Sequence, residues 1–149
     1  MTVENDAHFP RLKAEGWRQT SEATAVYNCI AYAAGDENCP WWPESLDAYW
    51  SEGATNEETV SAFIEAFGTL GYCQCADGTF EEGYEKVALY ALHTEPTHAA
   101  KQVGTEWRSK LGPDEDIAHT LAGLEGPLYG SVVAYMKRVQ QAPAPSEPK

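Results

Sequence analysis

The hydrophobic pattern of this chain changes its period close to Gly71, and this change constrains the fold more than any other feature. Between residues 56 and 70 the apolar side chains recur at helical spacing, after a start with the pattern of a capping box. Beyond Gly71 short strand-like runs take over, most clearly in the nearly continuous apolar segment 86–92. Helices followed by an antiparallel sheet predict an α+β fold.

The same patterns place the other expected elements. We expect helices at residues 44–50, 56–70 and 114–124, and strands at 72–75, 86–92, 97–103, 106–111 and 131–138. At 149 residues the chain suits a single domain, which we place at 19–139. Residues 1–18 are expected to be irregular, and the Pro- and Ala-rich residues 140–149 to form a disordered tail.

A cysteine stands at the head of the short apolar segment YNCIAYAAG. This segment predicts a buried helix with Asn28 before it, Cys29 in its first turn and Gly35 as its C-terminal cap. A thiol in that position meets unpaired backbone N–H groups and the positive end of the helix dipole, and both favour the thiolate. Cys29 is therefore a candidate nucleophile. The alternative is a buried structural thiol in an alanine-rich helix.

A histidine, His98, lies at the start of the expected strand 97–103 and can supply the base that a thiol nucleophile needs. A two-residue turn at Gly104-Thr105 would pair Val103 with Glu106 and place Ser109 diagonal to His98, on the same face of the hairpin. Ser109 is then the candidate that orients the imidazole. His119 and Asp116 are the alternatives for that third role, since a slip of one residue would turn Ser109 away.

The chain carries 23 acidic and 10 basic residues, a formal net charge of −13. Such a surface repels nucleic acid and anionic membranes, and it would attract a basic protein partner. The N-terminus lacks the pattern of a cleavable signal peptide, and no apolar run is long enough to span a membrane. We therefore expect a cytoplasmic protein, or one exported without a cleavable signal.

The remaining candidates concern the substrate. Two adjacent tryptophans, Trp41 and Trp42, stand between prolines and could line a cleft near Cys29, with Asn28 beside it. Cys73 and Cys75 would share one face of a strand, where they could form a metal or redox pair. The spacing matches no zinc motif, and we favour the interpretation as two small half-buried hydrophobes in a reduced cytosol. We expect neither a metal nor a cofactor.

Several segments together resemble an uncharacterised bacterial domain family associated with papain-like and NlpC-type cysteine hydrolases. The motifs are YNCIAYAAG, YEKVALYA, THAAKQ, W-x-SKLG, DI-x-H and YGSVV, which span roughly residues 19–138. The resemblance implies a papain-like fold, with N-terminal helices packed on a C-terminal antiparallel sheet. It assigns Cys29, His98 and Ser109 the places of nucleophile, base and orienting residue. The chain departs from papain at Ala23, where papain has its oxyanion-hole glutamine, and Gln19 lies further upstream.

Two functions follow as hypotheses. The first is a cysteine-dependent hydrolase or acyltransferase of the peptidase or amidase type, in which Cys29 attacks a carbonyl of a peptide or amide substrate and His98 transfers the proton. The second is a non-enzymatic protein-interaction module, with the Trp41-Trp42 loop as an exposed anchor and the acidic surface guiding a basic partner. A reactive Cys29 would favour the enzyme, and an inert, buried Cys29 would favour the module.

Overall fold

The computed structural model describes residues 9–22, 24–111 and 115–140. Its helices are α1 (Leu12–Glu15), α2 (Cys29–Ala34), α3 (Val60–Gly68) and the 3-10 turn η1 (Ala122–Leu124). Its strands are β1 (Trp17–Ser21), β2 (Cys73–Cys75), β3 (Tyr84–Leu92), β4 (Glu95–Val103), β5 (Glu106–Lys110), β6 (Asp116–His119) and β7 (Ser131–Val139). The expected tail, 140–149, lies outside these ranges except for Gln140.

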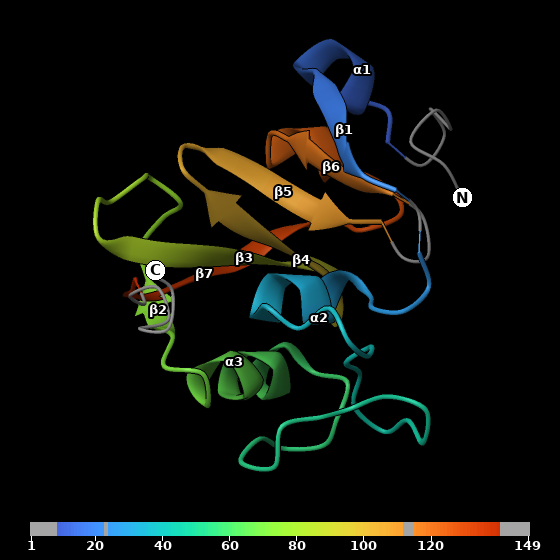
Figure 1. The fold of residues 1–149 in the computed structure, drawn as a ribbon, viewed down its shortest axis with the longest axis vertical. Coiled ribbons are helices and arrows are strands. Elements are labelled where there is room, and N and C mark those ends of the chain that lie inside the picture. Colours follow the sequence, from blue (N-terminus) through green and yellow to red (C-terminus); the bar gives the residue numbers. More distant parts are fainter. Residues whose placement is uncertain (1–8, 23, 112–114, 141–149) are drawn as a thin grey trace, which may run out of the picture.

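The strands form one seven-stranded antiparallel sheet in the order β1-β6-β5-β4-β3-β7-β2 (Figure 1). The long strands β4, β3 and β7 lie side by side, and the first strand of the chain forms one edge of the sheet against β6. The chain is therefore an α+β domain, as predicted, in which the sheet dominates and the helices are short.

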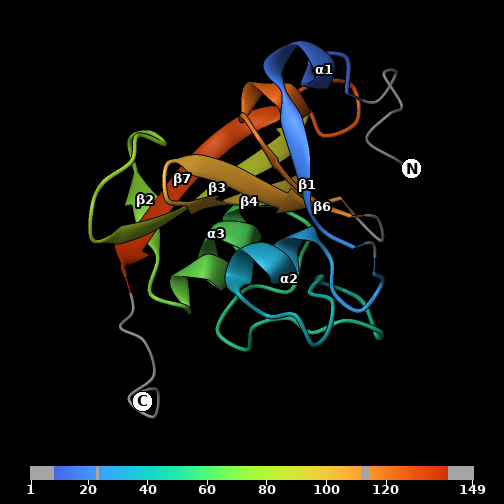
Figure 2. The same cartoon turned by 45° about the horizontal axis from the view of Figure 1, so that its top comes forward.

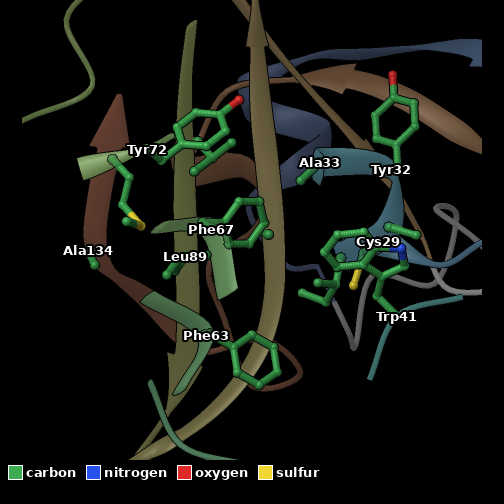
Figure 3. Close-up of a cluster of buried hydrophobic side chains, with 14 of the residues drawn as sticks. Cys29, Tyr32, Ala33, Trp41, Phe63, Phe67, Tyr72, Leu89 and Ala134 are labelled. Carbon is green, nitrogen blue, oxygen red and sulfur yellow. The ribbon is translucent and has the colours of Figure 1, made fainter. Parts of the chain in front are cut away.

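Both faces of the sheet are covered (Figure 2). Helices α2 and α3 pack on one face, which we call the helix face, around Leu89, Ala99 and Met136 (Figure 3). The opposite face, which we call the η1 face, is covered by Phe9, Leu12 and the segment from η1 to Tyr129. Because the sheet is buried on both sides, strand alternation decides which of two separate cores each side chain enters.

The caps predicted for α2 and the pairing predicted across the Gly104 turn are confirmed, whereas the capping-box pattern before residue 59 does not start a helix. Asn28 caps α2, with its side chain accepting a bond from the backbone N–H of Ala31, and Gly35 ends the helix in the left-handed conformation. Val103 pairs with Glu106 across the Gly104 turn, as the hairpin predicts. Helix α3 begins at Val60, four residues later than expected, and Thr59 is its cap.

Three predictions about secondary structure are wrong. Residues 44–50 form turns instead of a helix; Glu44 has a φ of 58°, and a bridge joins Trp41 to Tyr49. Within 114–124 the described residues form β6 and η1, since pairing with β1 and β5 holds residues 116–119 extended. Residues 9–18 are not irregular, because they contain α1 and the start of β1.

No helix among the described residues is long and apolar enough to cross a membrane.

Candidate functional site

Cys29 occupies the predicted position at the start of α2, but it is buried. Cys29 is 7% exposed, and its Sγ lies 4.0 Å from the carbonyl oxygen of Thr97 on β4. Burial raises the pKa of Cys29 to about 11, and this effect outweighs the backbone hydrogen bonds and the positive charge of Lys110, which lower it. Burial therefore disfavours the thiolate that the position at the helix start predicts.

His98 points into the other core. Its ring stacks on Tyr129 with centroids 4.1 Å apart and meets Tyr90 edge-on, and both tyrosines belong to the core on the η1 face. Cys29 packs with Ala99, the next residue of β4, on the helix face. The sheet thus separates the two side chains, and the expected Cys29–His98 hydrogen-bonded pair is wrong. Helix α2 packs on the face of β4 opposite to the one that carries the His98 side chain.

Ser109 lies on the same face as His98, as the predicted register requires, but it binds a different ring. Its Oγ is 2.7 Å from Nε2 of His119, and Nδ1 of His119 is 2.7 Å from the carbonyl oxygen of Thr120. Because a carbonyl can only accept, Nδ1 carries the proton and Nε2 accepts from the Ser109 hydroxyl. Ser109 and His119 are both buried, so this pair fastens β5 to the end of β6.

Lys110 and Asp116 share the helix face with Cys29, and the sequence pattern does not predict them there as a pair. They are opposite each other in β5 and β6, and both are fully buried. The hydroxyl of Tyr27 donates to Asp116 Oδ2 at 2.9 Å, and Lys110 Nζ lies 5.4 Å from the centroid of the Tyr27 ring. Strand alternation already predicts that Lys110 and Ser109 face opposite sides of the sheet. Only the position of α2 shows that the side of Lys110 is the helix face.

The expected substrate residues hold a loop in place. Asn28 accepts from the backbone N–H of Trp41 and donates to its carbonyl oxygen, so it joins α2 to the following loop. Trp41 is 6% exposed and donates its indole N–H to Asp36, and Trp42 donates to Glu58 and packs edge-on against Phe63. Trp41 is not an exposed anchor, and the polar groups of both tryptophans are already bonded within the fold.

A cleft is present elsewhere, at the end of the sheet where β3 begins and β4 ends. It has a volume of about 470 Å³. The ladder between β3 and β4 stops at Val87 and Lys101, although β3 stays paired with β7 to Tyr84 and β4 with β5 to Val103. The two strands therefore separate at this end, and in Figure 1 the β4–β5 hairpin lifts away from the start of β3.

Side chains from both faces line this split. They come from the end of α2, the loop before β3 and the ends of β4 and β7, and include Tyr72, Phe80, Tyr84, Lys101, Val103 and Arg138. The loop is fixed to β3 and β4 by two contacts: Lys86 Nζ donates to the carbonyl of Asp77, and the Gln102 amide donates to that of Gly78. The cleft is a preformed part of the fold.

The described residues contain no group of three or more His, Cys, Asp or Glu side chains placed to hold a metal ion, and all four cysteines are free.

We expect iodoacetamide at neutral pH to alkylate Cys73 well before Cys29, because Cys73 is exposed whereas Cys29 is buried and its pKa is about 11. Peptide mapping after partial labelling measures the order. A sample unfolded in urea is the control and should lose this order. Labelling of Cys29 first in the folded protein would contradict the buried, protonated thiol.

The chain belongs to the family described as Domain of unknown function (DUF7689), whose model matches residues 18–137. No curated protein and no solved structure matches the chain. The family description names neither an activity nor a fold.

Proposed function

We propose that this domain is a binding module that takes an extended segment of a partner protein into the split between β3 and β4. The observation that carries the proposal is the end of the β3–β4 ladder at Val87 and Lys101. Beyond that point the backbones of 84–86 and 102–104 no longer pair with each other. Peptides commonly bind by adding a strand to such an open strand edge, since the main-chain hydrogen bonds supply affinity without demanding a sequence.

The side chains around the split suit a peptide. Phe80, Tyr84 and Val103 line the cleft and remain 45%, 38% and 37% exposed. Exposed aromatic and branched side chains gathered at a concave site are typical of places where a partner buries apolar anchors. The surrounding net charge of −13 would steer a partner that carries basic residues near the bound segment.

The competing proposal is the papain-like cysteine hydrolase. It needs an accessible thiolate and a base beside it, whereas Cys29 is 7% exposed with a raised pKa, and His98 lies across the sheet. Lys110 shares the Cys29 side of the sheet, but it is fully buried as well. The cleft between β3 and β4 offers an open surface that the Cys29 region does not, and for this reason we favour the binding module.

The proposal is tested with peptides selected from a random library against the folded domain. We expect Phe80→Ala to weaken their binding by about five- to thirtyfold, since losing one apolar anchor in an interface costs about 1–2 kcal/mol. Leu46→Ala is the matched control, because Leu46 is a fully exposed apolar side chain that does not line the cleft. Calorimetry measures both variants. Equal binding to wild type and Phe80→Ala, or selection of peptides that Leu46→Ala weakens instead, would overturn the proposal.

A further inference from the structure

We propose that the cleft recognises the C-terminal carboxylate of the inserted segment, and that the Lys101 ammonium binds it. This inference rests on the proposed function and specifies its ligand. Three observations support it: the unused charge of Lys101, the arrangement of the neighbouring cations and the place of Lys101 along the split.

The Lys101 ammonium has no carboxylate partner in the described part of the chain. It lies over the ring of Tyr32, whose centroid is 4.2 Å from Nζ. A chain with 23 acidic side chains could easily supply an acid here, yet Lys101 forms neither an ion pair nor a side-chain hydrogen bond with any described residue. The charges of Glu37, Asp116 and Glu85 act on Lys101 from a distance, but they do not offset the hydration that it loses by burial. A bound anion in direct contact would therefore stabilise it.

The other cations of this region already have acidic partners. Arg138 donates to Glu85 at 2.9 Å, and Lys86 lies 3.5 Å from Glu81. Arg108, directly opposite Lys101 in β5, binds Glu106 at 2.7 Å. Like charges opposite each other in a sheet repel, so the Lys101–Arg108 arrangement destabilises the free domain and is relieved by an anion. The charge that remains for a ligand is that of Lys101.

The position of Lys101 indicates a chain end instead of an internal acidic residue. Lys101 pairs with Val87 in the last rung of the β3–β4 ladder, so it stands where the split closes. A segment inserted between the strands from the open end cannot continue past this rung. Its last residue therefore reaches Lys101, and the group that a peptide carries there is its terminal carboxylate.

The test uses an acetylated tripeptide of lysine, valine and phenylalanine, prepared as the free acid and as the amide. Binding is followed from the backbone amide shifts of Tyr84, Lys101 and Val103. We expect the acid to bind at least about tenfold more tightly than the amide, since a hydrogen bond between charged groups contributes about 1.5–3 kcal/mol. Lys101→Met should reduce the difference between acid and amide to less than about twofold. Lys13→Met, an exposed lysine of α1, is the matched control and should keep it.

A second readout separates binding from a structural effect of the substitution. Partial burial lowers the pKa of Lys101, and a bound carboxylate should raise it, which NMR titration of the ammonium measures in the wild-type protein. If Lys101→Met proves unstable, Lys101→Gln replaces it, and thermal unfolding shows which variant is folded.

The outcomes distinguish this inference from the proposed function. If acid and amide bind equally and Phe80→Ala weakens both, the binding module stands and the carboxylate inference falls. If neither tripeptide shifts the cleft amides while the selected peptides bind there, the chain-end inference also falls. If 3-phenylpropionate binds as tightly as the tripeptide acid, the ligand is a small apolar acid and not the end of a peptide. If no peptide binds the cleft at all, both proposals fall.

Discussion

Replacing Gly130 with alanine is expected to destabilise the domain by more than about 3 kcal/mol. Gly130 has a φ of 78°, and a Cβ at this position would overlap the backbone carbonyl of Ala91 in β3. The approach is close because Gly130 exchanges two backbone hydrogen bonds with Gly126 just before β7 begins to pair with β3. An added methyl group has to push the start of β7 away from β3, in the middle of the sheet. Urea unfolding measures the loss.

Gly35→Ala is the matched control, since Gly35 also has a positive φ, 92°, but nothing lies within 4 Å of an added Cβ. This substitution should cost only the strain of a left-handed alanine, about 1 kcal/mol. Equal losses of unfolding free energy in the two variants would show that the positive φ alone accounts for both. The close approach of Ala91 in β3 to Gly130 would then be contradicted.

The second large effect is loss of stability in acid. His98 and His119 are buried, and burial holds the pKa of His98 well below its ordinary value and lowers that of His119 to about 4. Below about pH 6.5 the unfolded chain binds protons at these positions and the folded domain does not. The free energy of unfolding should therefore fall as the pH falls from about 6 to 4, by roughly 1.4 kcal/mol per pH unit for each histidine. Thermal unfolding across this range measures the slope.

His98→Phe isolates one of the two contributions. His98 faces Tyr90, Tyr129 and the charge of His119, and its two ring nitrogens have no hydrogen-bond partner among the described residues. A phenyl ring can keep the stacking and loses no hydrogen bond, so we expect near wild-type stability at pH 7 and about half of the acid slope. An unchanged slope would show that His98 does not titrate on unfolding. A severe loss at pH 7 would show that its nitrogens are needed.

Local signals in the sequence predict local structure well. The cap at Asn28, the glycine at the end of α2 and the Val103–Glu106 pairing all depend on residues within a few positions of one another, and the structure confirms them. The shared face of His98 and Ser109 follows from the same short hairpin. Each of these predictions needs only backbone geometry and the alternation of a strand.

The candidate site could not be predicted because it depends on long-range packing. Alternation places His98 and Ala99 on opposite faces of β4, but the sequence does not say which face α2 covers, and both faces turn out to be apolar. The acidic start and apolar spacing around 116–119 predict part of a helix, while its strand partner β1 is polar and has no apolar alternation that would indicate a strand. The cleft depends on where one ladder ends, and this leaves no mark in the hydrophobic pattern.

The position of β1 has a consequence for the order in which the sheet can assemble. This strand is synthesised before the other strands of the sheet, yet it pairs with β6, which follows β5 in the chain. Strand β1 therefore stays unpaired until β6 is available, whereas the β3–β4 and β4–β5 hairpins can form earlier from neighbouring segments. Unpaired strands invite aggregation unless they are polar or charged. Four of the five residues of β1 are polar or basic. This composition gives no apolar alternation by which the strand could be predicted, and it also lowers the tendency of the unpaired strand to aggregate before β6 is available.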